Sequence, residues 1–290
     1  MRNFIDLHTH STASDGTLEP AAVIELADRK KLAAVALTDH DTVDGLAEAA
    51  EAARRFPDLQ VIAGIEISAL FTGGTLHILG LGIDPKAPAL TEMTARLRQA
   101  REDRNPNILA NLARLGVPVT MEEVLAQVKH LPTSRSRRVV GRVHIAMAMV
   151  RKGYVKDQSE AFAKYLGNDA PAFVNKEKTT PAEAIGAIVG SGGAAVLAHP
   201  PQLNCQNSAQ LERVVRDLMR YGMTGIEVYH SDNTPEQTRM YLNLARKHNL
   251  GIVGGSDFHG GAKSAVKMGL PRVPRSVVSG AFEAIVFRGL

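Results

Sequence analysis

Residues 4–10 have the sequence FIDLHTH, in which a short apolar run passes directly into two histidines separated by one residue. The run has the length and character of a β-strand that is buried on both faces. Along an extended chain, side chains two positions apart point to the same side, so His8 and His10 share one face. The stretch therefore predicts a buried strand that ends in a pair of imidazoles.

Similar apolar runs alternate with helical patterns along the rest of the chain. The predicted strands are residues 4–7, 33–37, 61–67, 76–82, 194–198, 225–229 and 251–255. The helices predicted between them are residues 19–31, 43–55, 181–190, 211–221 and 235–248. Alternation of this kind is typical of an α/β barrel or a doubly wound sheet.

Two regions depart from the alternation. The strands at 61–67 and 76–82 are joined by too few residues for a parallel crossover, which predicts an antiparallel hairpin. Residues 88–178 contain helical patterns only, at 90–115, 121–128, 140–152 and 158–166. We therefore expect residues 1–87 and 179–290 to form a barrel that is distorted at the hairpin. Residues 88–178 would form a helical insertion, or cap, that binds substrate.

Composition restricts the class of protein. Of the 290 residues, 44% are hydrophobic and 22% are charged, as in an ordinary globular protein. The apolar runs are of strand length and the N-terminus lacks an apolar signal region, so we expect neither a membrane span nor secretion. A single cysteine, Cys205, excludes an internal disulfide and fits a cytoplasmic location. The absence of tryptophan and a net charge of only +4 favour a small substrate over a long nucleic acid.

Histidines and carboxylates gather at or beside the predicted strand ends. Besides His8 and His10, they are Asp15, His40, Glu66, His77, His199, Asp257 and His259. Taken singly, a histidine in a strand is more often a core residue, and an aspartate in a loop is often a turn former. Together they predict one rim of ligands, because parallel strands of a barrel end on the same side. Mixed nitrogen and oxygen ligands suit Mn²⁺, Zn²⁺ or Fe²⁺ better than Ca²⁺ or Mg²⁺.

The chain resembles the PHP (polymerase and histidinol phosphatase) family in five motifs, which occur in the family's order. They are His8-Thr9-His10-Ser11, Thr38-Asp39-His40-Asp41, Gly64-Ile65-Glu66, Ala198-His199-Pro200 and Gly255-Ser256-Asp257-Phe258-His259. The resemblance covers residues 1–84 and 194–260 and is closest to the TrpH-like branch of metal-dependent phosphoesterases. It implies a distorted (β/α)7 barrel, which agrees with the seven predicted strands. That branch includes a 3′,5′-nucleoside bisphosphate phosphatase and a 5′→3′ exoribonuclease of short RNAs.

The resemblance also implies roles for the ligands. It assigns one metal to His8, His10, Glu66 and Asp257, a second to Glu66, His77 and His199, and a third to Asp15, His40 and His259. Many members of the family have histidine where this chain has Asp15, but the nearest branch has aspartate there. The implied cofactor is Mn²⁺, as two or three ions, with Zn²⁺ or Fe²⁺ as alternatives. Glu66 and Asp257 would be catalytic as ligands of metal ions that supply a hydroxide nucleophile at neutral pH.

Outside this ligand set, His230 follows the sixth predicted strand and is a candidate to protonate the leaving group. The alternative is a solvated loop histidine. In the insertion, basic and polar side chains are candidates to bind a second phosphate through forked hydrogen bonds, or else belong to a solvated helix face. These candidates are Arg104, Asn105, Arg135, Arg142 and His144, with Arg101 one helical turn before Arg104.

These observations predict a metal-dependent phosphoesterase. The leading hypothesis is a phosphatase that removes the 3′-phosphate of nucleoside 3′,5′-bisphosphates and leaves the 5′-nucleotide. The nearest alternative is a 5′→3′ exonuclease acting on short oligonucleotides, and a histidinol phosphate phosphatase is a third. A non-enzymatic metal-binding regulatory module stays open as a different class, although competent residues fill all nine ligand positions. We predict no obligate protein partner.

Overall fold

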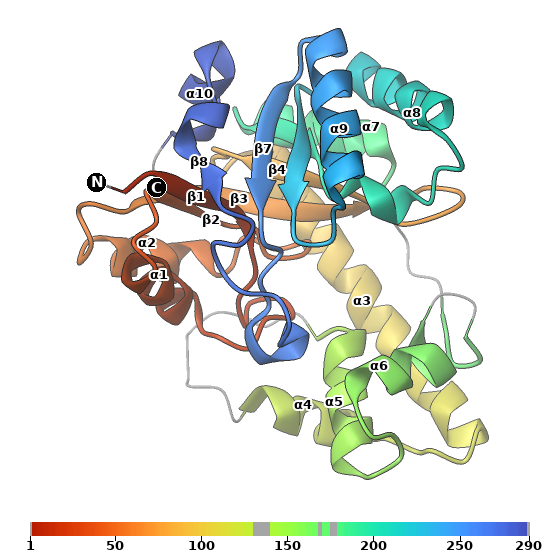
Figure 1. The fold of residues 1–290 in the computed structure, drawn as a ribbon. Helices are drawn as coiled ribbons and strands as arrows, with labels where there is room; N and C mark the ends of the chain where they lie inside the picture. Colours follow the sequence, from red (N-terminus) through yellow and green to blue (C-terminus); the bar gives the residue numbers. More distant parts are fainter. Residues whose placement is uncertain (1, 130–139, 168–169, 175–178, 289–290) are drawn as a thin grey trace.

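The computed structural model describes residues 2–129, 140–167, 170–174 and 179–288. Its strands form one sheet in the order β7-β6-β5-β4-β3-β2-β1-β8 (Figure 1). The sheet curls until β1 also lies beside β7, where the Asp257 amide donates to the His8 carbonyl at 2.9 Å and the His10 amide donates to the Phe258 carbonyl at 2.9 Å. The predicted α/β barrel with helices around it is confirmed.

All seven predicted strands are present. They are β1 (Phe4–Thr9), β2 (Ala34–Leu37), β3 (Gln60–Ala69), β4 (Leu76–Leu81), β5 (Ala194–Leu197), β6 (Gly225–His230) and β7 (Gly251–Gly255). The predicted hairpin is confirmed, because β3 and β4 pair antiparallel, and β4 is also antiparallel to β5. An eighth strand, β8 (Val273–Pro274), pairs with β1 and was not predicted, because two residues are too few to form a pattern.

Helices cover the outside of the barrel. They are α1 (Pro20–Arg29), α2 (Leu46–Ala53), α7 (Pro181–Gly190), α8 (Ser208–Arg220), α9 (Pro235–His248) and α10 (Gly280–Val286). The bounds predicted for α7 and α9 are confirmed, because each begins with a threonine N-cap, a proline and a capping box. Helix α10 was not predicted, and the bounds predicted for α1 and α2 were too long at both ends.

The remaining helices lie to one side of the barrel, below it in Figure 1. They are α3 (Pro88–Arg114), α4 (Met121–Lys129), α5 (Arg142–Arg151), α6 (Gln158–Ala161) and a π-helical turn at Phe162–Leu166. The helix predicted at 158–166 is present, as α6 followed directly by the π-helical turn. We call this group the cap. Among the described residues, no helix has the length and apolar character that crossing a membrane requires.

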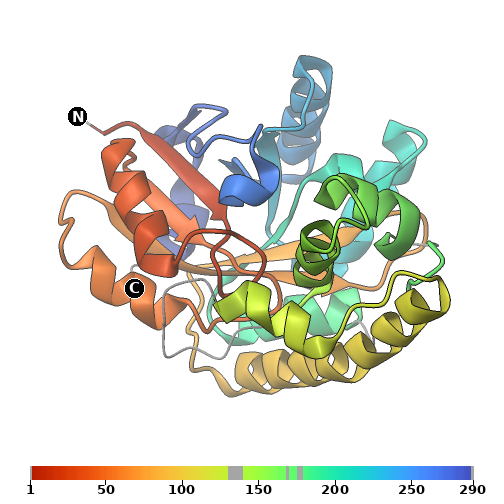
Figure 2. The same cartoon turned by 90° about the horizontal axis from the view of Figure 1, so that it is seen from below.

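Helix α3 joins the cap to the barrel. Its first half packs into the barrel's main apolar cluster through Leu90, Met93 and Leu97. Its second half packs into a separate cap cluster through Ile108 and Leu112. The same helix therefore contributes to both apolar cores and connects the barrel to the cap. Figure 2 shows it running along the underside of the molecule.

Candidate active site

Glu66, near the middle of β3, is the centre of the site. Its Oε2 lies 3.2 Å from Nε2 of both His8 and His10, and 3.0 Å from Nδ1 of His40. Its Oε1 lies 2.7 Å from His77 Nδ1 and 2.8 Å from His199 Nε2. One fully buried carboxylate thus faces five imidazoles, which come from β1, β2, β4 and β5 or from the residues directly after them.

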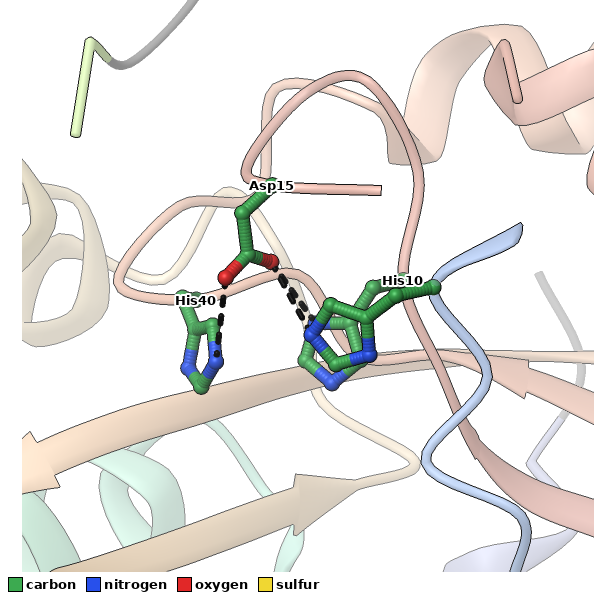
Figure 3. A group of neighbouring side chains, drawn as sticks. His10, Asp15 and His40 are labelled. Carbon is green, nitrogen blue, oxygen red and sulfur yellow. Dashed lines mark ion pairs between the residues drawn. The ribbon is translucent and has the colours of Figure 1, made fainter. Parts of the chain in front are cut away.

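The other predicted ligands complete the ring. Asp257 Oδ1 lies 3.1 Å from His10 Nε2, and Asp15 Oδ1 lies 3.2 Å from His259 Nε2. Figure 3 shows the Asp15 carboxylate directed toward His10 and His40. The structure therefore brings all nine residues together, although they span nearly the whole chain. Among the described residues, four groups have mutually close ligand atoms: His8 with His10, Glu66 and Asp257; His10 with Asp15, His40 and His259; His40 with Glu66 and His77; and His8 with Glu227 and His230, which were not among the predicted ligands.

The donor atoms of this cluster fit divalent cations. Within the part of the chain that the structure describes, several buried polar atoms of the cluster have no hydrogen-bond partner: His8 Nε2, both ring nitrogens of His10, His40 Nδ1, Glu66 Oε2 and His199 Nδ1. Buried polar atoms are normally satisfied, and leaving several unsatisfied in one place is costly. Cations placed among them would satisfy nitrogen and oxygen atoms together, which is the chemistry of Mn²⁺, Zn²⁺ or Fe²⁺ sites.

Hydrogen bonds on the far side of two rings direct lone pairs toward the cluster. The Nδ1–H of His259 donates to the backbone carbonyl of Asp257 at 2.8 Å, which leaves Nε2 as an acceptor. The Nδ1 of His8 lies 3.0 Å from Oε1 of Glu227 and donates to it in the same way. Metal-ligating histidines are commonly oriented by such partners, which also fix the tautomer.

Charge within the cluster is arranged for cation binding. Burial by itself would raise the pKa of Glu66, but His40, His77 and His8 hold it well below the usual value. Burial would lower the pKa of His10, but Asp257 and Glu66 raise it to about 9. The carboxylate is therefore ionised at neutral pH, and a metal ion must compete with protons on the imidazoles.

Two buried aspartates hold the loops that carry the ligands. Asp39 accepts hydrogen bonds from the Ser11 amide at 2.8 Å, the Ser11 hydroxyl at 2.7 Å and the Ser14 hydroxyl at 2.6 Å. Asp6 accepts from the Ser256 amide at 2.8 Å and the Ser256 hydroxyl at 2.6 Å. Each carboxylate thus fixes the backbone beside Asp15 or Asp257.

β-bulges lie in two of the strands that supply the site. In β1, Asp6 pairs with Val35 and Thr9 with Leu37, so β1 has one extra residue beside His8. In β6, Glu227 pairs with Val253 and Tyr229 with Gly254, which again leaves one extra residue. An extra residue changes the face to which the following side chains point. In β6 it allows Glu227 and His230, three positions apart, to reach the same cluster.

His230 lies inside the protein, beside the ligand cluster. Its side chain is fully buried, so the alternative of a solvated loop histidine is wrong. Its Nδ1 accepts a hydrogen bond from the Asp232 amide at 3.1 Å, and its Nε2 lies 3.8 Å from Asp257 Oδ2. Burial would lower the pKa of His230, but Glu227 and Asp257 raise it above the ordinary value.

Sequence reasoning missed two residues at the site. Glu227 is a buried carboxylate inside the apolar run of β6, and that unusual position was the available signal. Lys263 follows His259 by four residues, and its Nζ lies 2.6 Å from Asp257 Oδ2. Nothing in the spacing of Lys263 marks it, because it reaches the cluster only through the short turn of residues 260–263.

Arginines of the cap face the ligand cluster across a cavity of about 190 Å³. Its lining includes Asp15, His40 and His77 from the barrel and Arg101, Arg104 and Arg142 from the cap. Burial, together with Arg101 and Arg142, lowers the pKa of Arg104 to about 9. Burial and Arg101 also lower the pKa of Arg142. The three guanidinium groups are therefore close enough to repel one another.

Each of these arginines also has partners within the protein. Arg101 pairs with Asp41, which follows the second strand. Arg104 donates to Asn105 Oδ1 at 3.0 Å, and its buried Nε has no hydrogen-bond partner among the described residues. Arg142 donates to the Leu166 carbonyl at 2.8 Å and lies over the rings of Phe162 and Phe173.

The other predicted substrate residues are placed differently. The Asn105 side chain donates to the Val140 carbonyl at 2.9 Å, beside Arg104. His144 is buried, and its Nδ1 accepts a hydrogen bond from the Gly141 amide at 3.0 Å at the start of α5. Arg135 lies outside the described residues. Asn105 and His144 thus shape the backbone near the cavity, whereas Arg104 and Arg142 line it.

The fold and the site together define a class: a barrel with a metal-binding ring of histidines and carboxylates at its strand ends. Comparison with known proteins agrees. Residues 6–221 match the PHP domain. The chain is 36% identical over 255 residues, 88% of its length and 87% of the relative, to the 3′,5′-nucleoside bisphosphate phosphatase of Chromobacterium violaceum. It is 34% identical over 254 residues, 88% of its length and 89% of the relative, to the 5′–3′ exoribonuclease of Haemophilus influenzae.

A solved structure from Bifidobacterium adolescentis, described as that of a metal-dependent phosphoesterase, has the same fold. It superposes with a TM-score of 0.86 at 33% sequence identity and covers 99% of this chain and 96% of that one. The chain therefore belongs to the PHP domain family and is a metal-dependent phosphoesterase. The predictions of the family and of an enzyme are confirmed.

Proposed function

We propose that this phosphoesterase removes the 3′-phosphate of nucleoside 3′,5′-bisphosphates and leaves the 5′-nucleotide and phosphate. The observation that carries the proposal is the position of Arg101, Arg104 and Arg142 across one cavity from His40 and His77. A single phosphate ester needs only the ligand cluster. A second phosphate would account for this second set of cations, of which Arg104 is buried and Arg101 and Arg142 are partly buried.

The nine rim residues would hold two or three Mn²⁺ ions, with Glu66 shared between two of them. Such ions supply a nucleophile at neutral pH and neutralise charge on the transferring phosphoryl group. The chain's own contribution is positioning. The strand ends fix the imidazoles and carboxylates, and the guanidinium forks of the cap would bind the remote phosphate with paired hydrogen bonds.

His230 is the candidate to give a proton to the leaving alkoxide. Because its Nδ1 accepts from the Asp232 amide, its proton resides on Nε2, which faces the cluster. His230→Asn should slow hydrolysis of an ester with a basic leaving group more than hydrolysis of an aryl phosphate. Unchanged limbs of the pH–rate profile, together with an unchanged rate, would exclude this role.

The bisphosphate specificity is tested by Arg104→Gln. Hydrogen bonds to charged groups contribute about 1.5–3 kcal/mol, so we expect KM for a nucleoside 3′,5′-bisphosphate to rise roughly 10- to 150-fold. KM for a simple aryl phosphate should stay unchanged, because that substrate has no second phosphate. Arg114→Gln, at an exposed position of the same helix, is the matched control. Equal effects of Arg104→Gln on both substrates would contradict the proposal.

A 5′→3′ exonuclease is the second candidate, supported by the name of the Haemophilus influenzae relative. A further cleft of about 590 Å³ separates Arg151, Lys156 and Gln158 of the cap from the turn after His259. It would offer room for nucleotides downstream of the scissile bond. Comparing kcat/KM on a nucleoside 3′,5′-bisphosphate and on a 5′-phosphorylated short RNA separates the two activities. A large preference for the RNA would select the exonuclease.

A further inference from the structure

Glu227 is a buried carboxylate that belongs to none of the predicted metal sites. It lies in β6 between Ile226 and Val228, which both pack into the apolar cluster. The side chain is fully buried, and such a charge persists only where donors or cations surround it. Its surroundings therefore show what the carboxylate does.

Both oxygens of Glu227 bind residues of the ligand ring. Oε1 accepts from His8 Nδ1 at 3.0 Å, across 219 residues of sequence. Oε2 accepts from the backbone amide of His199 at 2.7 Å. One side chain of β6 thus connects the end of β1 to the end of β5.

The second contact falls on an unusual backbone. His199 has φ 24° and ψ 69°, outside the regions that L-residues favour. A conformation of this kind persists only where its surroundings hold it in place. The amide of this residue is the one that Glu227 binds, so the contact fixes the direction in which the His199 ring leaves the strand.

We propose that Glu227 is a positioning residue that orients His8 and His199 at once, so that two neighbouring metal sites depend on one carboxylate. The proposal rests on the ligand roles proposed above for His8 and His199, but not on the identity of the substrate. Through Nδ1 it fixes the tautomer in which His8 offers its Nε2 lone pair. Through the backbone it fixes where His199 offers its ring.

Glutamine is the informative replacement because it has the same shape but only one acceptor oxygen. If that oxygen binds the His199 amide, the amide nitrogen of glutamine faces His8 Nδ1 and donates to it. His8 then carries its proton on Nε2, which can no longer ligate a metal. If the side chain turns over, the His199 amide loses its acceptor instead.

The test measures bound Mn²⁺ in the full chain without any substrate. Wild type, Glu227→Gln and Val228→Ala are loaded with Mn²⁺, and the metal per chain and its loss to a chelator are measured by elemental analysis. Val228→Ala is the matched control, because it weakens the packing of the same strand without touching a ligand. Thermal unfolding followed by circular dichroism establishes that each variant is folded.

We expect Glu227→Gln to bind Mn²⁺ roughly 10- to 100-fold more weakly, as is typical when a partner of a ligating histidine is lost. Val228→Ala should retain metal like the wild type. The proposal would be overturned if Glu227→Gln retained as much Mn²⁺ as the wild type, or if Val228→Ala lost as much Mn²⁺ as Glu227→Gln. If Glu227→Gln does not fold, Glu227→Asp replaces it; its shorter side chain cannot reach both donors, so retention equal to the wild type would again overturn the idea.

Two further variants separate this inference from the ligand assignment. His8→Ala and His199→Ala should each lose metal whatever the role of Glu227. If they lose metal and Glu227→Gln does not, only the positioning role fails. If they retain metal, the proposed ligand set itself fails.

Discussion

The rim of the barrel and the arginines of the cap lie on opposite sides of one cavity and carry different charges. At the rim, the carboxylates of Glu66, Asp257 and Asp15 face a ring of imidazoles, and several lone pairs have no donor. In the cap, three arginines face one another, and Asp41 pairs with Arg101. The rim therefore suits cations, whereas the positive charge of the cap suits an anion. In the proposed function, one phosphate of the substrate would lie on metal ions held by the rim and the second phosphate would lie on the arginines.

The two regions also differ in how they are held. Strand ends, bulges and buried aspartates fix the rim from several directions. The arginines of the cap stand on α3 and α5, which share one apolar cluster outside the barrel. Removing a rim residue should therefore abolish chemistry on every substrate, whereas removing a cap residue should change which substrate is preferred.

The largest effect is expected for Glu66→Gln. The change removes the negative charge that two predicted metal sites share, and metal ions provide several kcal/mol of transition-state stabilisation. We expect kcat/KM to fall at least about a thousand-fold on a bisphosphate and on an aryl phosphate alike. Elemental analysis should show metal loss, whereas Glu236→Gln, at an exposed position, should change neither quantity. A fall in kcat/KM on only one of the two substrates would contradict the separate roles given to the rim and the cap.

Arg142→Lys tests the cap with the charge retained. Lysine keeps the positive charge but loses the fork and the stacking on Phe162 and Phe173. We expect kcat/KM for the bisphosphate to fall roughly 10- to 100-fold, consistent with one or two charged hydrogen bonds. Steady-state kinetics on an aryl phosphate should be unaffected, and Arg114→Lys should match the wild type on both substrates. A full rescue by lysine would mean that charge alone matters.

Asp39→Asn tests the support of the rim. An amide has one acceptor oxygen, so it cannot serve the Ser11 amide, the Ser11 hydroxyl and the Ser14 hydroxyl as the carboxylate does. We expect the free energy of unfolding to fall by about 1–3 kcal/mol, measured by urea denaturation. Because the loop leads to Asp15, the third metal should bind more weakly. A stable variant with unchanged metal content would contradict the supporting role.

The smallest effect is expected away from both regions, at Glu183, an exposed residue in the first turn of α7. Hydrogen bonds from Thr180 and Thr179 lower the pKa of Glu183 from 4.5 to about 2. Because its pKa is depressed in the folded state, its stabilisation is present above pH 4.5 and is lost as the pH falls toward 2. Glu183→Gln should therefore reduce stability by at most about 1 kcal/mol at pH 7, since exposed charges are screened.

The pH series provides the check on that variant. Unfolding curves of Glu183→Gln and wild type should converge as the pH is lowered through this window. A difference that persists unchanged at pH 2 would show that the carboxylate charge is not responsible.

Much of the site was predictable because each ligand is part of a local motif. His8 and His10, Glu66, and Asp257 with His259 each lie at the end of an apolar run, and strand ends of a barrel meet at one rim. The capped helices α7 and α9 were predictable for the same reason, since their signals lie within four residues. Strand β8 and the two bulges were not predictable. The strand is too short to form a pattern, and a bulge depends on the pairing with the neighbouring strand.

What the sequence by itself determined is therefore the barrel, its order of elements and the nine residues that gather at the rim, all of which follow from short-range patterns. Only the tertiary structure decided which groups support and complete them. Arg101 meets Asp41 across 60 residues, and Glu227 meets His8 across 219. No local pattern encodes such contacts, because they depend on how bulged strands and a shared helix bring distant charges within hydrogen-bonding distance.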